Sequence, residues 1–124
     1  MNILKSKTIF IIEDDQDISD ALSSLLKDEG YNVVVAENGV MALILLKQYG
    51  LPHLILLDMM MPVMSGPQFV EKFALEYADA CPIILMTAAE NASQRAQNIG
   101  AIAWIVKPFS LIQLIELVKL HERK

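Results

Sequence analysis

The stretch HLILLDMMMP, residues 53–62, decides the fold and poses a chemical question. Its four consecutive apolar residues, 54–57, are typical of a strand that is buried on both faces, and they end at the carboxylate of Asp58. An unpaired carboxylate beside a hydrophobic core costs on the order of several kcal/mol. Asp58 must therefore be neutralised by its neighbours or used in chemistry.

Length and composition limit the classes of protein to consider. We expect one domain spanning residues 1–124, because this length suffices for one hydrophobic core and not for two. A content of 54% hydrophobic and 20% charged residues excludes a disordered chain, and the apolar runs are far shorter than the ~20 residues of a membrane span. The net charge of -5 argues against direct DNA binding, which depends on Lys and Arg.

Cysteine use and the N-terminal sequence indicate the compartment. Cys81 is the only cysteine, so the chain has no internal disulfide, and residues 1–7 lack the apolar core of a secretory signal. These features predict a cytoplasmic protein that does not associate with membranes. We interpret Cys81 as a structural residue.

Short apolar runs alternate with segments of helical periodicity along the whole chain. The predicted strands are residues 8–12, 32–36, 53–57, 82–86 and 102–106. A first helix carries an apolar stripe from Ile18 to Leu26, with Asp15 or Asp17 as its N-cap and Gly30 after its end. Four further helices are predicted at residues 40–49, 67–78, about 91–99 and 110–121. This alternation predicts an α/β fold with a parallel sheet covered by helices on both faces.

Polar side chains follow four of the predicted strands. These groups are Glu13, Asp14 and Asp15, then Asp58, then Thr87 and Ala88, and finally Lys107 and Pro108. Ligands bind at the carboxyl ends of the strands in open parallel sheets, so we expect these groups to share one site. Crowded carboxylates favour a hard divalent cation, and Mg²⁺ suits a site that also binds phosphate oxygens. With Lys107 and Thr87 contacting the phosphoryl oxygens, Asp58 is predicted to act as a carboxylate nucleophile toward phosphorus.

Each of these residues also has a simpler interpretation. Acidic residues after a strand are common helix N-caps, a threonine at a strand end is often a turn residue, and a lone lysine is usually solvated. The convergence of all four positions on one edge of the sheet is what favours a functional site.

The chain resembles the receiver domain of two-component response regulators over essentially its whole length. The resemblance is carried by IFIIEDD, LILLDMMMPVMSG, ILMTA and GAIAWIVKPF, in the order and approximate spacing of that family. It implies a flavodoxin-like (βα)5 three-layer sandwich with strand order 2-1-3-4-5. It also implies a phosphohistidine donor on a sensor histidine kinase or a histidine phosphotransfer protein.

The resemblance further implies a role for each site residue. Asp58 corresponds to the phosphoacceptor, Asp14 to a direct ligand of Mg²⁺ (or Mn²⁺) and Glu13 to a ligand through water, whereas Asp15 falls outside this pair as a cap or bystander. The remaining implied roles are a backbone carbonyl ligand from Met60, phosphoryl contacts from Thr87, Lys107 and the Ala88 amide, loop-shaping roles for Pro62 and Gly66, and a cis peptide bond before Pro108.

In this family, phosphorylation draws the threonine toward the phosphate and an aromatic residue of the fifth strand turns inward. The surface formed by the fourth helix, fifth strand and fifth helix then changes its partner binding. Trp104 stands where the family usually has Tyr or Phe, so we expect a working but altered switch; a fixed surface anchor for a partner is the alternative. Met60 and Ala89 are apolar where a side chain could orient an attacking water, which predicts slow dephosphorylation.

Several alternatives remain open at this point. The helix at 110–121 is apolar nearly all round, which fits either a homodimer or partner surface or ordinary exposed leucines. His53 and His121 are interpreted as a strand-start residue and a surface residue. The chain is expected to be a complete small protein that acts on an unknown target, and a receiver cut from a longer regulator or hybrid kinase is the alternative. Another alternative is a degenerate receiver that binds partners without being phosphorylated.

Two other classes of protein fit less well. An aspartyl-phosphate hydrolase of the haloacid-dehalogenase type needs a second Asp at the position of Met60. A flavin or dinucleotide carrier needs a glycine-rich phosphate loop, and the five glycines form no such cluster.

Overall fold

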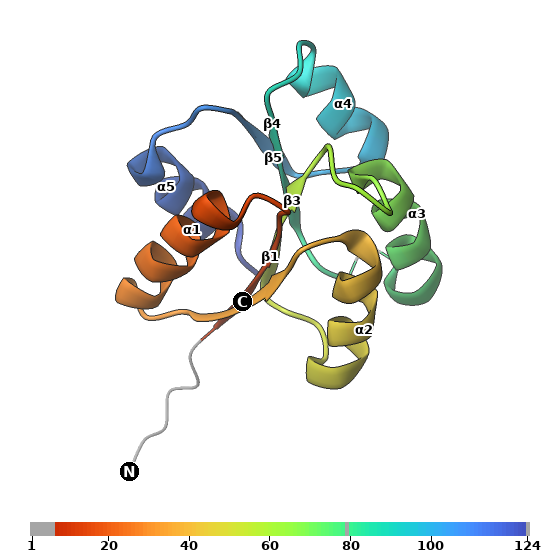
Figure 1. Cartoon of the computed structure of the whole chain (residues 1–124), viewed down its shortest axis with the longest axis horizontal. Coiled ribbons are helices and arrows are strands. Elements are labelled where there is room, and N and C mark those ends of the chain that lie inside the picture. The colour runs from red at the N-terminus through yellow and green to blue at the C-terminus, as the bar shows by residue number, and fades with distance from the viewer. Residues whose placement is uncertain (1–6, 79, 124) are drawn as a thin grey trace.

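The computed structural model describes residues 7–78 and 80–123, and a five-stranded parallel sheet lies at its centre (Figure 1). The strand order is β2-β1-β3-β4-β5, which confirms the order 2-1-3-4-5 implied by the family resemblance. The strands are β1 (Thr8–Ile12), β2 (Asn32–Ala36), β3 (Leu54–Asp58), β4 (Ile83–Thr87) and β5 (Ala103–Val106).

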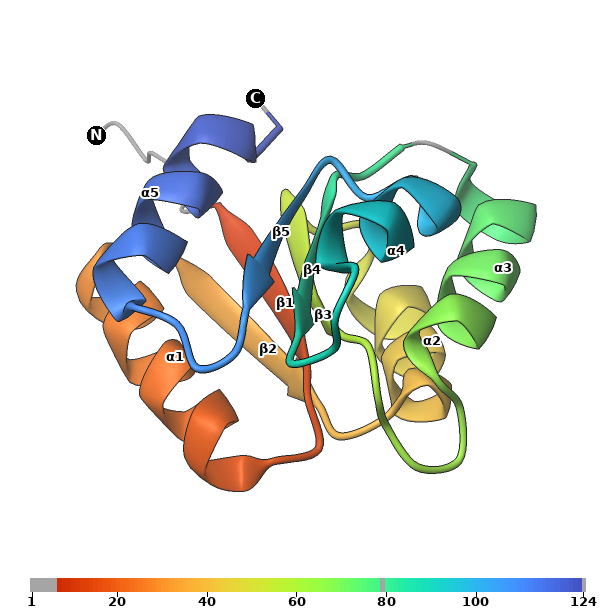
Figure 2. The same cartoon turned by 90° about the horizontal axis from the view of Figure 1, so that it is seen from above.

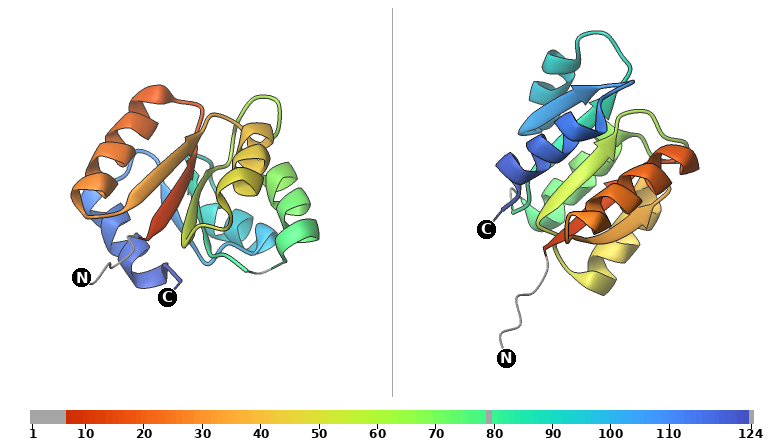
Figure 3. Two further views of the ribbon diagram at one scale, coloured as in Figure 1. Left: turned by 90° about the horizontal axis from the view of Figure 1, so that it is seen from below. Right: turned by 90° about the vertical axis from the view of Figure 1, so that its left-hand side faces the viewer.

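Five helices cover the sheet on both faces. They are α1 (Gln16–Asp28), α2 (Gly39–Tyr49), α3 (Gly66–Tyr77), α4 (Ala92–Ile99) and α5 (Leu111–His121). Helices α1 and α5 lie on one face, and α2, α3 and α4 lie on the other, as Figure 2 and the left view of Figure 3 show from opposite sides. The chain therefore forms the predicted three layers.

The alternation of side chains along each strand produces two separate cores. In β1, Ile9 and Ile11 pack with Leu22 of α1 and Leu114 of α5, whereas Phe10 points to the other core. That second core also contains Ile12, Ala42, Leu46, Ile55, Leu57, Phe69 and Phe73. Burial on both faces explains why the strands are apolar at nearly every position.

Polar side chains fix the helix starts at the edge where the site lies. Asp15 is the N-cap of α1 and accepts a hydrogen bond from the Ile18 N–H, which selects between the two caps that the sequence allowed. Asn38 caps α2 in the same way, and Ser65 forms a capping box with Gln68 at the start of α3.

Two central strands end one residue later than predicted. Asp58 pairs with Met86 in the sheet, and the Met59 N–H still donates to the Met86 carbonyl. Asp58 and Thr87 are therefore the last residues of β3 and β4, and not the first residues of the following loops. The regular backbone of the sheet thus holds both of these predicted site residues.

No helix in residues 7–78 and 80–123 has the length and hydropathy needed to cross a bilayer.

Candidate phosphorylation and metal site

Three carboxylates converge at the carboxyl edge of the sheet. Glu13 and Asp14 follow β1, Asp58 ends β3, and one oxygen from each lies within 4.8 Å of the others. Glu13 and Asp58 are buried, whereas Asp14 is exposed and keeps the cluster open to solvent. The sequence prediction that these residues share a site is consistent with this geometry.

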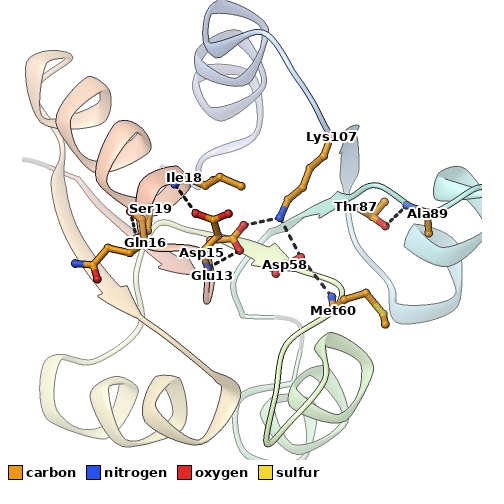
Figure 4. A network of polar contacts seen from close by, with 10 residues as sticks. All are labelled: Glu13, Asp15, Gln16, Ile18, Ser19, Asp58, Met60, Thr87, Ala89 and Lys107. Atoms are coloured by element: carbon orange, nitrogen blue, oxygen red, sulfur yellow. Dashed lines mark hydrogen bonds and ion pairs between the residues drawn. The ribbon is translucent and has the colours of Figure 1, made fainter.

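Lys107 enters the cluster from the end of β5 (Figure 4). Its Nζ lies 2.6 Å from Glu13 Oε1 and 3.3 Å from Asp58 Oδ1. The shorter of these contacts, with Glu13, was not foreseen from the sequence, because residue spacing does not show which of two adjacent carboxylates turns inward. Glu13 Oε2 also accepts the Asp15 N–H at 3.1 Å, so the Glu13 carboxylate is held at both oxygens.

With Lys107 as the only cation beside it among the described residues, the Asp58 carboxyl group is harder to ionise than a free aspartate. Burial, followed by the hydrogen bond and negative charge of Glu13, raises the pKa of Asp58 to about 7 against the opposing effect of Lys107. Burial on its own lowers the pKa of Lys107, but the hydrogen bond with Glu13 and the charges of Asp58 and Glu13 reverse this effect, so the pKa of Lys107 is raised. Lys107 is therefore positively charged, but its single charge does not neutralise three carboxylates.

A small divalent cation fits this arrangement. The three carboxylates supply hard oxygen atoms on an open rim, where Mg²⁺ can keep several water ligands. Glu13, Asp14 and Asp58 are the residues that could hold it, together with the Met60 backbone carbonyl implied by the resemblance.

A hydroxyl group lies at the end of β4. Thr87 is buried, and its Oγ1 accepts the Ala89 N–H at 3.0 Å. Ala88 between them is exposed, and the role of its amide stays a prediction. Because the hydroxyl hydrogen of Thr87 is not used in this contact, it is free to donate to a ligand oxygen.

The loop between β3 and α3 forms another wall of the site. The Met60 N–H donates to Asp58 Oδ1 at 3.3 Å, and the Gly66 N–H donates to the Met59 carbonyl at 3.0 Å. A Cβ atom on Gly66 would lie 2.9 Å from the Asp58 carbonyl oxygen, so this glycine permits a close backbone approach. Met60, Pro62 and Val63 are the exposed residues of the loop.

Val63 is a feature of this loop that the sequence did not reveal. Its φ angle is 69°, and the Met64 N–H donates to the Pro62 carbonyl at 2.7 Å, which closes a tight turn around Val63. Positive φ is a rare conformation for a β-branched residue. A turn signal of Gly or Asn would have predicted it, and Val gives none.

The fifth strand leads from the site to an exposed surface. Trp104 is 42% exposed, and together with Val106, Leu117 and Leu120 it lines a groove of about 400 Å³ between β5 and α5. Leu114, Ile115 and Val118 of α5 face the core, whereas Ile112 and Leu120 on its outer face are apolar and exposed. The peptide bond between Lys107 and Pro108 is cis, as the resemblance implies.

Fold and site together define a receiver-type signalling domain. The family model of the response regulator receiver domain matches residues 9–119, and the chain belongs to this family.

Named relatives and solved structures agree with this assignment. The probable transcriptional regulator ycf29 of Porphyra purpurea is 32% identical over 117 residues, which are 92% of this chain and 56% of the relative. The sensory transduction protein RegX3 of Mycolicibacterium smegmatis is 30% identical over 114 residues, 90% of this chain and 49% of the relative. The chain thus spans about half the length of the curated relatives it matches.

Two structural neighbours are covered almost completely. The chemotaxis protein CheY4 of Vibrio cholerae superimposes with a TM-score of 0.85 at 28% identity, covering 94% of this chain and 99% of that one. The response regulator TrrA of Thermotoga maritima, solved in complex with Mg²⁺-BeF, gives a TM-score of 0.80 at 32% identity, covering 92% and 97%.

Proposed function

We propose that this chain is a phosphoacceptor module of a two-component or phosphorelay system, with Asp58 as the acceptor. The observation that carries the proposal is the buried Asp58 carboxylate, in contact with Lys107 and within 4.8 Å of Glu13 and Asp14. Receiver domains of this family take their phosphoryl group from histidine kinases or phosphotransfer proteins, and the solved complex of TrrA with Mg²⁺-BeF supports a metal-dependent reaction.

In the proposed reaction, an Asp58 carboxylate oxygen attacks the phosphorus atom of a phosphohistidine. The P–N bond breaks, the P–O bond to Asp58 forms, and the imidazole leaves with the electron pair and takes up a proton. Lys107 and the Thr87 hydroxyl stabilise the charge on the equatorial oxygens. Mg²⁺ held by Asp14, Asp58, the Met60 carbonyl and, through water, Glu13 would supply charge neutralisation at the carboxylates and the phosphoryl group.

The output of the proposed switch is the surface of α4, β5 and α5. Thr87 ends β4 next to Val106 of β5, so movement of Thr87 toward a phosphoryl group changes the packing beneath the exposed groove that Trp104 lines. An unknown target protein or a second copy of the chain would bind there. The two alternatives are that residues 1–124 form the receiver part of a longer regulator or hybrid kinase, and that they form a receiver that binds partners without phosphorylation.

Intact mass after incubation with acetyl phosphate tests the proposal. Wild type should gain the mass of one phosphoryl group only with Mg²⁺, and Asp58→Asn should gain none. Asp14→Asn should lose most of the gain, whereas Asp15→Asn is the matched control, because Asp15 caps α1 and asparagine is an equally good cap. Absence of any gain in wild type, under conditions that modify a known receiver, would favour the receiver that only binds partners.

The emission of Trp104 tests the switch separately, since it is the only tryptophan in the chain. If its half-exposed indole turns inward, beryllofluoride with Mg²⁺ should shift its fluorescence to shorter wavelength. Asp58→Asn should show no shift. An unchanged spectrum in wild type that has bound the analogue would instead make Trp104 a fixed anchor for a partner.

A further inference from the structure

The three methionines that follow Asp58 differ sharply in their access to solvent. Met59 is 6% exposed and packs in a core with Leu85, Met61 is partly buried, and Met60 is 72% exposed. Among the methionines that the structure describes, Met60 is the most exposed; Met41 is 39% exposed and Met86 is fully buried. An oxidant in solvent therefore reaches the Met60 sulfur far more readily than the sulfur of Met59 or Met86.

The backbone of Met60 is fixed at the rim of the acceptor site. Its N–H donates to Asp58 Oδ1 at 3.3 Å, and the preceding residue is held on both sides, through the Met86 carbonyl and the Gly66 N–H, each at 3.0 Å. Figure 4 shows the Met60 N–H directed at Asp58 and the Met60 side chain extending away from that carboxylate. The Met60 backbone is thus held next to the acceptor carboxylate, and its exposed side chain starts at the rim of the site.

We propose that Met60 is a reversible oxidation site whose sulfoxide form shortens the lifetime of the phosphoryl group on Asp58. This inference rests on the proposed function. A peroxide transfers one oxygen atom to Met60 Sδ: the sulfur supplies the electron pair, the O–O bond breaks, and the second oxygen of hydrogen peroxide leaves as water. Methionine sulfoxide reductases reverse this oxidation in proteins.

The two oxidation states of Met60 differ in their ability to hold water. A thioether is a weak hydrogen-bond acceptor, so it cannot orient a water molecule for attack on phosphorus. A sulfoxide oxygen is polar and accepts hydrogen bonds. Because a positioned base contributes roughly 10²-fold or more, a neutral acceptor that only orients water should give a smaller effect, about threefold to tenfold faster hydrolysis.

The first measurement maps the oxidised residue. The native chain is treated with dilute hydrogen peroxide for increasing times and digested, and fragment masses assign each added oxygen to a residue. Met60 should be oxidised before Met41, and Met59 and Met86 should be oxidised last. Oxidation of Met59 or Met86 before Met60 would overturn the proposal.

The second measurement is the lifetime of the phosphorylated protein with and without peroxide. Oxidation should shorten the lifetime threefold to tenfold in wild type and in Met41→Leu, and should not change it in Met60→Leu. Met60→Gln, which carries a polar acceptor of similar length, should show a shortened lifetime without peroxide. An unchanged lifetime in wild type with Met60 fully oxidised would reject this inference alone; no phosphorylation before any peroxide is added would reject the proposed function as well.

Discussion

At the scale of single residues, Val63 carries strain beside the proposed acceptor site. Its φ angle of 69° places a β-branched side chain in a region where Cβ crowds the backbone. Val63 is also exposed, so its side chain gains little from packing in return. Asn91, at the start of α4, has a φ angle of 61° and is a residue type that tolerates this region.

Replacing Val63 with asparagine should therefore stabilise the protein by about 1 kcal/mol, because the turn stays and its strain is reduced. Asn91→Val is the matched control: the Asn91 side chain makes no capping hydrogen bond, so this change mainly introduces the backbone strain and should destabilise by a similar amount. Urea unfolding measures both changes. Equal stabilities of Val63→Asn and wild type would show that the loop relaxes around Val63 at no cost.

Met60 and Ala89 are apolar at the two positions where the family resemblance predicts a side chain that can orient an attacking water. Met60→Asn and Ala89→Glu should each accelerate loss of the phosphoryl group severalfold, because each adds an acceptor that can orient water, and the effect should stay below the roughly 10²-fold that a positioned base contributes. The decay of the phosphorylated mass after removal of acetyl phosphate measures the rate. Unchanged decay in both variants would mean that side chains at these positions do not limit hydrolysis.

At the scale of elements, two glycines begin helices in different surroundings. A Cβ on Gly66 would lie 2.9 Å from the Asp58 carbonyl oxygen and 3.1 Å from Met59 Cα, which are backbone atoms that cannot move without distorting β3. A Cβ on Gly39, the first residue of α2, would meet Met64 Sδ at 2.7 Å, which is the flexible end of a side chain.

Gly66→Ala should thus destabilise the protein by roughly 2 kcal/mol or more and weaken phosphorylation, since the loop that follows Asp58 must shift. Gly39→Ala should change stability by less than about 1 kcal/mol, because Met64 can adopt another rotamer. Urea unfolding and the acetyl phosphate assay measure the two effects. Equal losses in both variants would contradict the argument that backbone contact is what makes Gly66 essential.

The order of the elements was predictable because burial leaves a simple pattern in the sequence. Strands covered on both faces are apolar at nearly every position, and Glu13, Asp58, Thr87 and Lys107 follow them or end them. The parallel arrangement then brings these four residues to one edge. Their convergence at one edge therefore followed from the parallel direction of the strands, whereas the strand order was implied by the family resemblance.

Contacts within the site were not predictable in the same way. The 2.6 Å contact of Lys107 with Glu13 depends on side-chain rotamers and on the hydrogen bond that fixes the second oxygen of Glu13. The last residues of β3 and β4 depend on which N–H groups continue the ladder, which hydropathy does not encode. The strained turn at Val63 depends on the path of the loop, and nothing in its residue type indicates positive φ.

At the scale of the whole molecule, the two edges of the sheet have different tasks. The acidic residues lie at the carboxyl edge of the sheet. At the opposite edge, residues after α5 bind the segments that precede β1 and β3. Arg123 donates to the carbonyls of Pro52 and Leu51 at 2.9 and 3.1 Å, and Lys7 pairs with Glu122 at 3.0 Å. These bonds fix α5 at one end, so a change in the position of α5 is easier at the end near the proposed acceptor site.

The contacts of His53 at this edge of the sheet should make the stability of the protein depend on pH. Its Nδ1 accepts the Thr8 N–H at 3.1 Å, which requires the neutral ring. Burial, and then the positive charges of Arg123 and Lys7, lower the pKa of His53 against the opposing charge of Glu122. The unfolded chain, with a histidine pKa of about 6.5, therefore binds the proton more readily than the folded chain does.

The contribution of His53 to stability is accordingly complete above pH 6.5 and is lost as the pH falls from there through the lower pKa of the folded state. His53→Asn, whose Oδ1 can accept the same Thr8 N–H, should lose less stability than wild type in urea unfolding between pH 7.5 and pH 5.5. NMR titration of the ring should give a pKa below 6.5 in wild type and one closer to 6.5 in Arg123→Gln, which lacks the nearby cation. Parallel stability curves for wild type and His53→Asn would show that His53 does not set the acid response of this edge.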